Sequence, residues 1–474
     1  MRLPSTVTFV LPALITLFAA PALAQAATCQ VDPTGSFGMP HPSIDDALSS
    51  GGCDQPGSVI EVYCPAWGCS QGSTTIHGLD QIYVLSAELW GYGPATLTSS
   101  YSGAAVSIEN SREILFEGFA QIAGEDVGVA VIDSRVIVIG SHAHGRYTDI
   151  GGHGAGIYAE GDSRLDLVWV AVTESGRGMS LQGTHSGAPH VLAEGFAATW
   201  NEVAVFSEGS PGPVLEVRSD FGPTMHNYIV SNVEGVELRG ESDAVFDHTI
   251  VAGNLRMWPG SPTDPEVFNV QDHASLSLRN ALIYDNDSVP NPGVLLPWSA
   301  CGGGPSCHNT PGRILEHGSS KLVSLEASTI IDNQTDIVIN LDGAGGGGIV
   351  VDHTVFANNW GKVFSTSSYY PGCPSIINHD SFLWDNRVGV DPSSCDPGFG
   401  HGWDPHAMPG AVTPDAMLGF PHFMGPYADL YRVHVLEPSP SYALPANLYL
   451  GPDWSVDGAT ADADPLDVGY HNPL

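Results

Sequence analysis

Short apolar runs recur along the chain and are separated by similar polar turns. Five eight-residue windows align with one another, and they begin at Asp247, Asn280, Ala327, Asp352 and Asp380. The fourth position is aliphatic in every window: Ile250, Ile283, Ile330, Val355 and Leu383. The seventh position is Asn in every window but the first, which has Gly253: Asn286, Asn333, Asn358 and Asn386. Two residues before the window, four of the five segments have an apolar residue: Val245, Leu278, Leu325 and Val350. The fifth segment has Asn378 at this position.

The window starts lie 33, 47, 25 and 28 residues apart. Repeats of this length, built from short β runs and fixed turns, indicate a solenoid in which each unit buries its apolar face only against its neighbours. An Asn at one position of every coil can also bond amide to amide with the next coil. The pattern therefore predicts an all-β fold, a right-handed parallel β-helix of roughly ten coils.

The remaining pattern extends this prediction towards both ends of the chain. Residues 42–48 have helical spacing behind Ser43, which predicts a short capping helix, and residues 57–62 read as the first strand. Residues between Asp285 and Lys321 form a Pro/Gly-rich excursion that explains the longest spacing. We expect four segments: a signal peptide at 1–24, an N-terminal cap at 25–57, the β-helix at 58–390, and a Pro/Gly/Asp-rich, irregular C-terminal cap at 391–474.

The first segment has the pattern of a secretory signal. Arg2 precedes an apolar run over residues 10–20, and Ala22-Leu23-Ala24 offers a cleavage site. Pro12 and Pro21 interrupt the run, which favours a signal peptide over a retained membrane anchor. The sequence thus predicts a protein that is secreted or displayed at the cell surface.

The eight cysteines agree with export. An even number of cysteines in an exported chain predicts disulfides: Cys29, Cys53, Cys64, Cys69, Cys301, Cys307, Cys373 and Cys395. We expect Cys301 to pair with Cys307 and Cys373 with Cys395 as local closures. The first four allow three pairings, which the sequence leaves open. A zinc cluster is disfavoured because no C-x-x-C doublet occurs.

The net charge of −37, with only two lysines, narrows the range of partners. A surface this acidic argues against nucleic acid and against anionic membranes as partners. It also disfavours an acidic polysaccharide unless calcium bridges the two. The partners that remain are a polysaccharide of another charge or a cell-surface component.

Several segments resemble known exported β-helix proteins. Residues 29–70 resemble the N-terminal cap of pectate-lyase-like proteins. Residues 347–349 (Gly-Gly-Ile) and 356–359 (Phe-Ala-Asn-Asn) resemble repeat elements of bacterial proteins of the polymorphic-outer-membrane type, and residues 152–158 are a looser copy. The tail over residues 429–470 is similar to the closing segment of that group. The resemblance implies a parallel β-helix, but the group has mixed functions and implies no single activity.

Histidines provide two candidate constellations. Asp352-His353-Thr354 and Asp247-His248-Thr249 contain the residue types of a catalytic triad, but adjacent residues on an extended strand point to opposite faces, so we expect structural turns. The densest histidine cluster is a candidate metal site: His142, His144 and His153. Asp149 could orient one of these ligands. Of the signatures of β-helix hydrolases that act on pectin, only Gly-His-Gly appears, at residues 152–154.

Two further groups could bind ligands. Three alternate or near-alternate carboxylates in the tail could converge on calcium: Asp462, Asp464 and Asp467. Asp457 lies nearby in the sequence. We expect such an ion to stabilise the acidic fold rather than to catalyse a reaction. Aromatic side chains could stack on sugars: Trp90, Tyr92, Tyr369, Tyr370 and Trp384.

The functional prediction is an exported, non-catalytic β-helix protein that binds a glycan or a surface partner along its side. The alternative is a polysaccharide lyase or glycoside hydrolase whose carboxylate site has no recognisable signature. A binding protein needs an aromatic or polar stripe, whereas an enzyme also needs converging ionisable groups.

Overall fold

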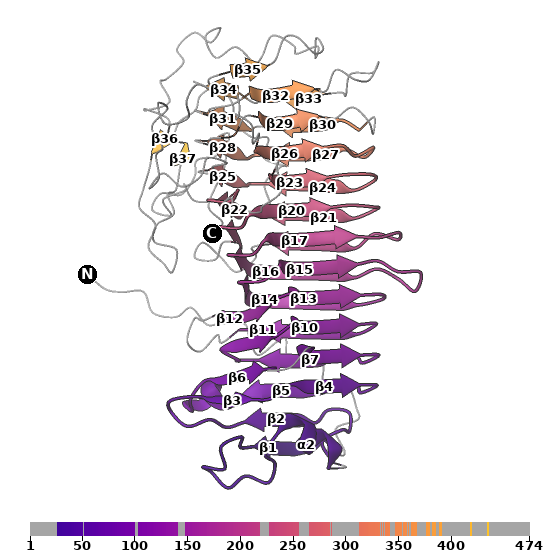
Figure 1. Ribbon diagram of the computed structural model, residues 1–474, viewed down its shortest axis with the longest axis vertical. Coiled ribbons are helices and arrows are strands. Elements are labelled where there is room, and N and C mark those ends of the chain that lie inside the picture. Colours follow the sequence, from indigo (N-terminus) through magenta and orange to yellow (C-terminus); the bar gives the residue numbers. More distant parts are fainter. Residues whose placement is uncertain are drawn as a thin grey trace, which may run out of the picture.

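Three parallel β-ladders wind around one apolar core, so the fold is the predicted right-handed parallel β-helix (Figure 1). The computed structural model describes residues 26–50, 52–99, 103–140, 147–218, 227–255 and 265–284, with shorter stretches between residues 286 and 435. The coils stack along the long axis of the molecule, from β1 at one end to β35 at the other.

Each ladder collects the strands that lie on one side of the solenoid. The first ladder consists of β1 (Thr28–Val31), β2 (Val59–Val62), β5 (Tyr83–Ser86), β8 (Ile114–Glu117), β11 (Arg135–Ile139), β14 (Arg164–Thr173), β16 (His190–Thr199), β18 (Val214–Arg218), β21 (Asp243–Asp247), β24 (Ser275–Arg279), β27 (Val323–Glu326), β30 (Ile349–Asp352) and β33 (Ile376–His379). The second ladder consists of β3 (Cys69–Gln71), β6 (Ala95–Thr98), β9 (Gln121–Gly124), β12 (Thr148–Gly152), the second halves of β14 and β16, β19 (Asn227–Val230), β22 (Thr249–Ala252), β25 (Leu282–Tyr284), β28 (Thr329–Ile331), β31 (Val355–Ala357) and β34 (Phe382–Trp384). The third ladder consists of β4 (Thr74–His77), β7 (Ala104–Glu109), β10 (Val127–Ile132), β13 (Ala155–Glu160), β15 (Arg177–Gln182), β17 (Val203–Glu208), β20 (Glu234–Leu238), β23 (Glu266–Val270), β26 (Arg313–His317), β29 (Ile337–Leu341), β32 (Lys362–Thr366) and β35 (Val388–Val390).

The coils begin early in the chain and outnumber the prediction. The third ladder is a 12-stranded sheet, against roughly ten coils expected. β1 already pairs in parallel with β2, Thr28 opposite Val59, so parallel pairing starts within the segment 25–57. Outside the three ladders lie the helix α2 (Ile44–Ser49), a 3₁₀ turn, η1 (Ala87–Trp90), and the antiparallel pair β36 (Leu418–Gly419) and β37 (His434–Val435).

Columns of apolar side chains fill the interior. In the third ladder, paired positions on consecutive strands all point inwards and are buried: Val205, Val236, Phe268, Leu315 and Ile339. Phe246 of the first ladder meets Phe268 across the core, with ring centroids 6.2 Å apart. Each such side chain contributes about 1.5–3 kcal/mol by leaving water, and the core runs continuously through the stack.

A ladder of asparagines stabilises the corner between the second and third ladders. Its members are all buried: Asn201, Asn232, Asn254, Asn286, Asn333 and Asn359. From Asn201 to Asn333, each Nδ2 donates to the Oδ1 of the next Asn at 2.9–3.0 Å. Each Nδ2 also donates to a carbonyl oxygen of the preceding coil at 2.8–3.1 Å. The predicted amide stack is therefore present, and it satisfies backbone groups that the corner would otherwise leave buried and unpaired.

The sequence alignment identified this ladder with a register error of one residue in two windows. Asn286 and Asn333 are ladder members as predicted, and Asn386 lies outside the described residues. The assignment of Asn358 to the ladder was wrong, because the ladder residue is Asn359. In the first window Gly253 is not an exception, because the next residue, Asn254, is the ladder member. Strand pairing agrees with this correction, since Ile283 lies opposite Val251 and Ile330 lies opposite Phe356.

The predicted capping helix is present as α2 (Ile44–Ser49). Ser43 caps it, with its side chain accepting from the backbone N of Asp46 at 3.0 Å. The helix buries Ile44, Ala47 and Leu48. Asp45 ties it to the first strand of the third ladder, since its Oδ1 accepts from the Thr74 hydroxyl at 2.8 Å.

Two disulfides close the N-terminal end, as expected for an oxidising compartment. Of the three pairings left open, the structure has Cys29 bonded to Cys53 and Cys64 bonded to Cys69, with Cα–Cα distances of 6.2 and 5.2 Å. The other four cysteines lie outside the described residues: Cys301, Cys307, Cys373 and Cys395. In the part of the chain that the structure describes, no helix combines the length and apolarity needed to cross a membrane.

Candidate ligand-binding sites

Three aromatic rings from separate turns meet at the N-terminal end of the solenoid. The centroids of Tyr63 and Tyr92 are 4.9 Å apart and those of Phe37 and Tyr92 are 5.5 Å apart, both edge to face. Phe37 is 40% exposed and Tyr92 is 39% exposed. We call Phe37, Tyr63 and Tyr92 the aromatic cluster. Large apolar groups held together yet open to water at one place mark an interaction surface.

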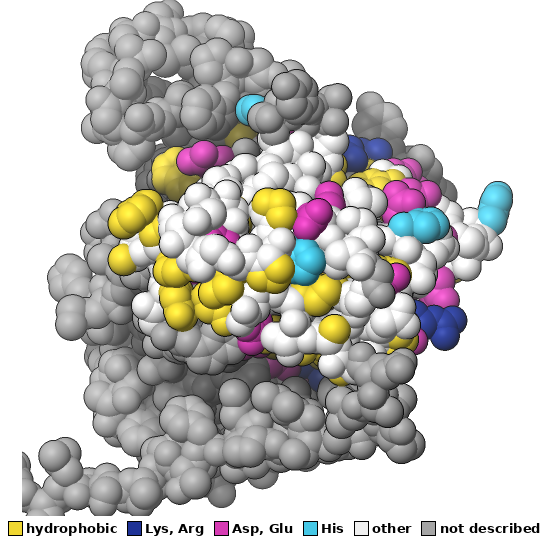
Figure 2. Space-filling model, turned by 90° about the horizontal axis from the view of Figure 1, so that it is seen from below, with side chains coloured by type: hydrophobic (Ala, Val, Ile, Leu, Met, Phe, Trp, Pro, Cys, Tyr) yellow, Lys and Arg dark blue, Asp and Glu magenta, His cyan; other side chains and the backbone are white. Residues whose placement is uncertain are grey.

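A fourth aromatic side chain extends this surface. Trp67 is 84% exposed and sits on the turn closed by the Cys64–Cys69 disulfide. That turn packs tightly against the segment that follows Tyr92, because a Cβ on Gly93 would lie 1.7 Å from the carbonyl oxygen of Pro65. Figure 2 views the molecule from this end and shows hydrophobic side chains gathered on one side of it. The disulfide and the close packing hold the turn in place beside the aromatic cluster.

Polar atoms border the aromatic cluster. The Tyr63 hydroxyl donates to Glu61 Oε2 at 2.7 Å, and Gln30 Nε2 approaches the same hydroxyl at 3.5 Å. Burial, together with the neighbouring Glu61 carboxylate, raises the pKa of Tyr63 to about 12. The hydroxyl therefore remains protonated at physiological pH, and the site combines ring surfaces with fixed hydrogen-bonding groups.

A second group of ionisable side chains lies on the outer face of the third ladder. Glu234 and Glu237 project from β20, and Glu266 follows on β23. Burial and the negative charges of Glu237 and Glu202 raise the pKa of Glu234 to about 7. Arg239 forms an ion pair with Glu237. Glu234 thus exchanges its proton near neutral pH beside an arginine-paired carboxylate.

Further along the same face, charges are paired rather than free. Arg313 Nη1 lies 2.7 Å from Glu316 Oε2 and 3.7 Å from Glu266 Oε1. Asn340 Nδ2 donates to Glu316 at 2.8 Å. These contacts fix the orientation of the Glu316 carboxylate, so this stretch is preorganised.

The predicted histidine cluster is only partly described. His153 is exposed at the corner after β12, while His142 and His144 lie outside the described residues. Asp149 accepts a 2.5 Å hydrogen bond from the Thr173 hydroxyl, and burial raises the pKa of its carboxyl group. The described contact of Asp149 is therefore with Thr173, and the proposed metal ligation by these histidines stays a prediction.

The side chains of Asp247 and His248 lie close together, so the prediction that they point to opposite faces was wrong. His248 has φ of 49° at the corner between β21 and β22, and its Nδ1 lies 2.9 Å from Asp247 Oδ1. The chain is bent there, so adjacent side chains can converge. The Thr249 hydroxyl nevertheless donates to the backbone oxygen of Asp247 at 3.2 Å, so these three residues do not form a triad. The structural role that the sequence predicted for this turn agrees with the fold.

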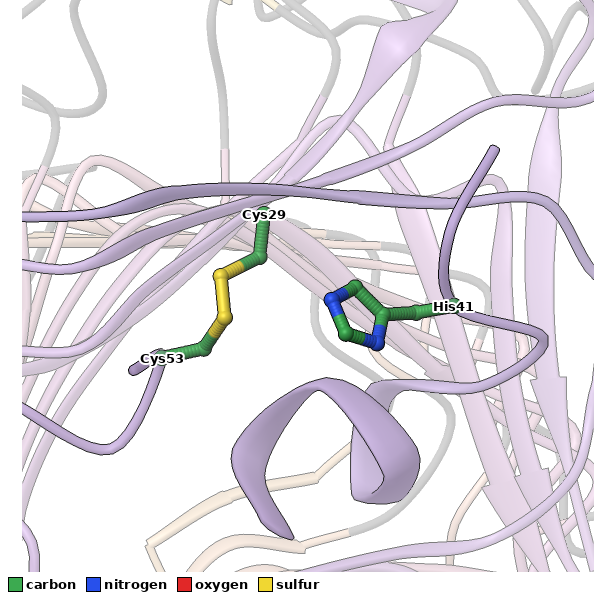
Figure 3. Close-up of side chains that lie close together, drawn as sticks. All are labelled: Cys29, His41 and Cys53. Atoms are coloured by element: carbon green, nitrogen blue, oxygen red, sulfur yellow. A yellow bond between two sulfur atoms is a disulfide. The ribbon is translucent and has the colours of Figure 1, made fainter. Parts of the chain in front are cut away.

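One group of metal-ligand types does come together near α2. Cys29, His41 and Cys53 place their ligand atoms within 4.8 Å of one another (Figure 3). The two sulfurs are bonded to each other, so neither is available as a thiolate. His41 Nδ1 pairs with Asp46 Oδ2 at 2.9 Å. The group acts as a covalent and polar link between β1 and the capping helix.

Other sequence candidates fall outside the described residues. These include the proposed calcium ligands: Asp462, Asp464 and Asp467. Tyr369 and Tyr370 also lie outside the described residues. The same holds for the side chains of Trp90 and Trp384. Of the proposed stacking residues, Tyr92 is described and exposed. The sequence did not single out Phe37, Tyr63 or Trp67, although large aromatics within glycine-rich turns are a usable signal for Phe37 and Trp67.

Comparison with known proteins leaves the family open. No protein-family model and no curated protein matches the chain. Among solved structures, the crystal structure of pectate lyase Pel9A is similar, with 14% sequence identity, a TM-score of 0.31, and coverage of 94% of this chain and 96% of that chain. A likeness at this level says nothing about the ligand or the activity of this chain.

Proposed function

We propose that this protein is an exported, non-catalytic β-helix protein that binds a glycan at its N-terminal end. The exposed aromatic side chains carry this proposal. The C–H faces of a pyranose ring are apolar and stack on aromatic rings, while its hydroxyls need hydrogen-bond partners. Phe37, Tyr92 and Trp67 supply exposed rings, and Glu61 and Tyr63 supply polar atoms beside them. The two disulfides of the described residues support export.

The proposal is tested by affinity electrophoresis against a panel of soluble neutral, acidic and amino polysaccharides. We expect Trp67→Ala and Tyr92→Ala each to weaken binding by about five- to tenfold, which corresponds to roughly 1–1.4 kcal/mol. Trp200→Ala is the matched control, because Trp200 is also exposed (53%) but sits at the corner before Asn201. Equal losses in all three variants, or no retardation by any polymer, would refute the proposal.

A second candidate function is cleavage of a polysaccharide on the outer face of the third ladder. Glu234 supports it, since a carboxyl group that is half-protonated near pH 7 can donate a proton to a leaving glycosidic oxygen. Glu237, which is ion-paired with Arg239, would be the second carboxylate that glycoside hydrolysis requires. Release of reducing ends, or of unsaturated products absorbing in the ultraviolet, would reveal turnover. Activity that survives Glu234→Gln would exclude this site.

A further inference from the structure

The N-terminal stretch that carries the aromatic cluster contains no lysine or arginine. The sequence contains no Lys or Arg from Leu3 to Ser111, and the first one after that is Arg112. The same stretch carries eight carboxylates from residue 26 onwards: Asp32, Asp45, Asp46, Asp54, Glu61, Asp80, Glu88 and Glu109. Figure 2 shows the dark blue side chains of Lys and Arg away from the hydrophobic patch at this end. This stretch therefore contributes a negative potential around the aromatic cluster.

One carboxylate belongs to the site itself. Glu61 lies on β2, two residues before Tyr63, so alternation along the strand places both on the outer face. Its Oε2 accepts a hydrogen bond from the Tyr63 hydroxyl. By contrast, Asp32 and Asp45 are bonded to backbone and threonine groups of the cap. Glu61 is thus the carboxylate placed to meet a ligand that stacks on Tyr92.

We propose that the glycan carries free amino groups, so that the ligand is an amino-sugar polysaccharide with ammonium groups. The inference rests on the proposed function and specifies its ligand. An ammonium group gains from the negative faces of exposed rings and from Glu61. A uronic acid polymer would place carboxylates beside Glu61 and find no Lys or Arg from residue 3 to residue 111.

The test compares glucosamine hexamer, its fully N-acetylated form and polygalacturonate by titration calorimetry with the full chain at pH 6 and low salt. We expect the amino hexamer to bind about tenfold more tightly than the acetylated one, with the ratio shrinking in 0.5 M salt. Glu61→Gln keeps an oxygen for the Tyr63 hydroxyl but removes the charge, so it should reduce this ratio by about threefold or more. Glu208→Gln removes an exposed charge from β17 and should leave the ratio unchanged.

The outcomes separate two kinds of failure. Equal affinity for the amino and acetylated hexamers overturns the inference and leaves glycan binding in place. Binding of the amino hexamer that Tyr92→Ala does not weaken shows general attraction to an acidic protein, and this also overturns the inference. If neither hexamer nor polygalacturonate binds, the inference is overturned, and the wider polysaccharide panel decides whether the proposed function fails as well. Circular dichroism of Tyr92→Ala confirms that lost binding is not lost folding.

Discussion

Replacing Asn286 by Ala should be among the most damaging single substitutions in the solenoid. The side chain is fully buried, and its Oδ1 accepts both the backbone N and Nδ2 of Asn254 at 3.0 Å. Its own Nδ2 donates to Asn333 Oδ1 at 2.9 Å and to the Val251 carbonyl at 3.1 Å. The substitution therefore removes contacts to the coil before and to the coil after at once.

The magnitude follows from what each partner has left. Asn254 Nδ2 still donates to the Ile229 carbonyl at 2.8 Å, and Asn333 Oδ1 still accepts from the backbone N of Asn286 at 3.2 Å. The backbone N–H of Asn254 loses its acceptor while buried, which costs about 1–3 kcal/mol. Adding roughly 1 kcal/mol for the remaining lost bonds gives about 2–4 kcal/mol, a large part of the 5–15 kcal/mol typical of a folded protein.

The assay is guanidinium unfolding followed by tryptophan fluorescence and by circular dichroism, because a solenoid can unfold in parts. Asn110→Gly is the control: Asn110 is exposed with φ of 50°, which glycine tolerates, so the change should stay below about 0.5 kcal/mol. Asn286→Asp should destabilise the fold more at pH 7 than at pH 4, because an ionised carboxylate has no hydrogen to donate to Asn333 Oδ1 or to the Val251 carbonyl oxygen. If Asn286→Ala lowers the free energy of unfolding no more than Asn110→Gly does, the reasoning is refuted.

Three further predictions concern protons, disulfides and calcium. Burial raises the pKa of Glu234 to about 7 from 4.5, so the folded protein loses stability as the pH rises from 4.5 to 7 and the carboxyl group ionises. Glu234→Gln should therefore stabilise the protein at pH 8 by about 1–2 kcal/mol, after allowance for partial exposure, and should have no such effect at pH 4. Thermal melts at the two pH values check this; equal shifts contradict it. The Cys29–Cys53 bond spans 24 residues, so replacing both cysteines by serine should cost about 3 kcal/mol, and peptide mapping should find this pair linked. We also propose that calcium stabilises the acidic fold, so chelation at matched ionic strength should lower the melting temperature; a calcium shift that persists in Asp464→Ala with Asp467→Ala would place the ion elsewhere.

The sequence predicted the architecture because inward apolar positions repeat from coil to coil. It missed the register of two windows for a physical reason that the second ladder reveals. Ile250, facing outwards, is as fully buried as Val251, facing inwards, and the same holds for Leu282 and Ile283. When both faces of a strand are buried, alternation no longer distinguishes them, and a slip of one residue leaves the hydrophobic pattern intact.

The candidate site was harder to predict than the fold. Phe37, Tyr63 and Tyr92 come from three turns with no common spacing, and only the stacking of coils brings them together. The raised pKa of Glu234 comes from burial and from the negative charges of Glu237 on its own strand and Glu202 on the preceding coil. Such constellations depend on tertiary neighbours, so a repeat pattern read along one chain does not contain them.

The asparagine ladder separates what is fixed in a coil from what is free. Consecutive ladder residues are 31, 22, 32, 47 and 26 residues apart, yet their amides stay within 2.9–3.0 Å of each other. Most of the extra length enters directly after a ladder residue, as between Asn286 and β26. The corners after Asn254 and Asn286 therefore work as insertion points where loops of new sequence can be exchanged without disturbing neighbouring coils, which makes the solenoid a scaffold for grafting.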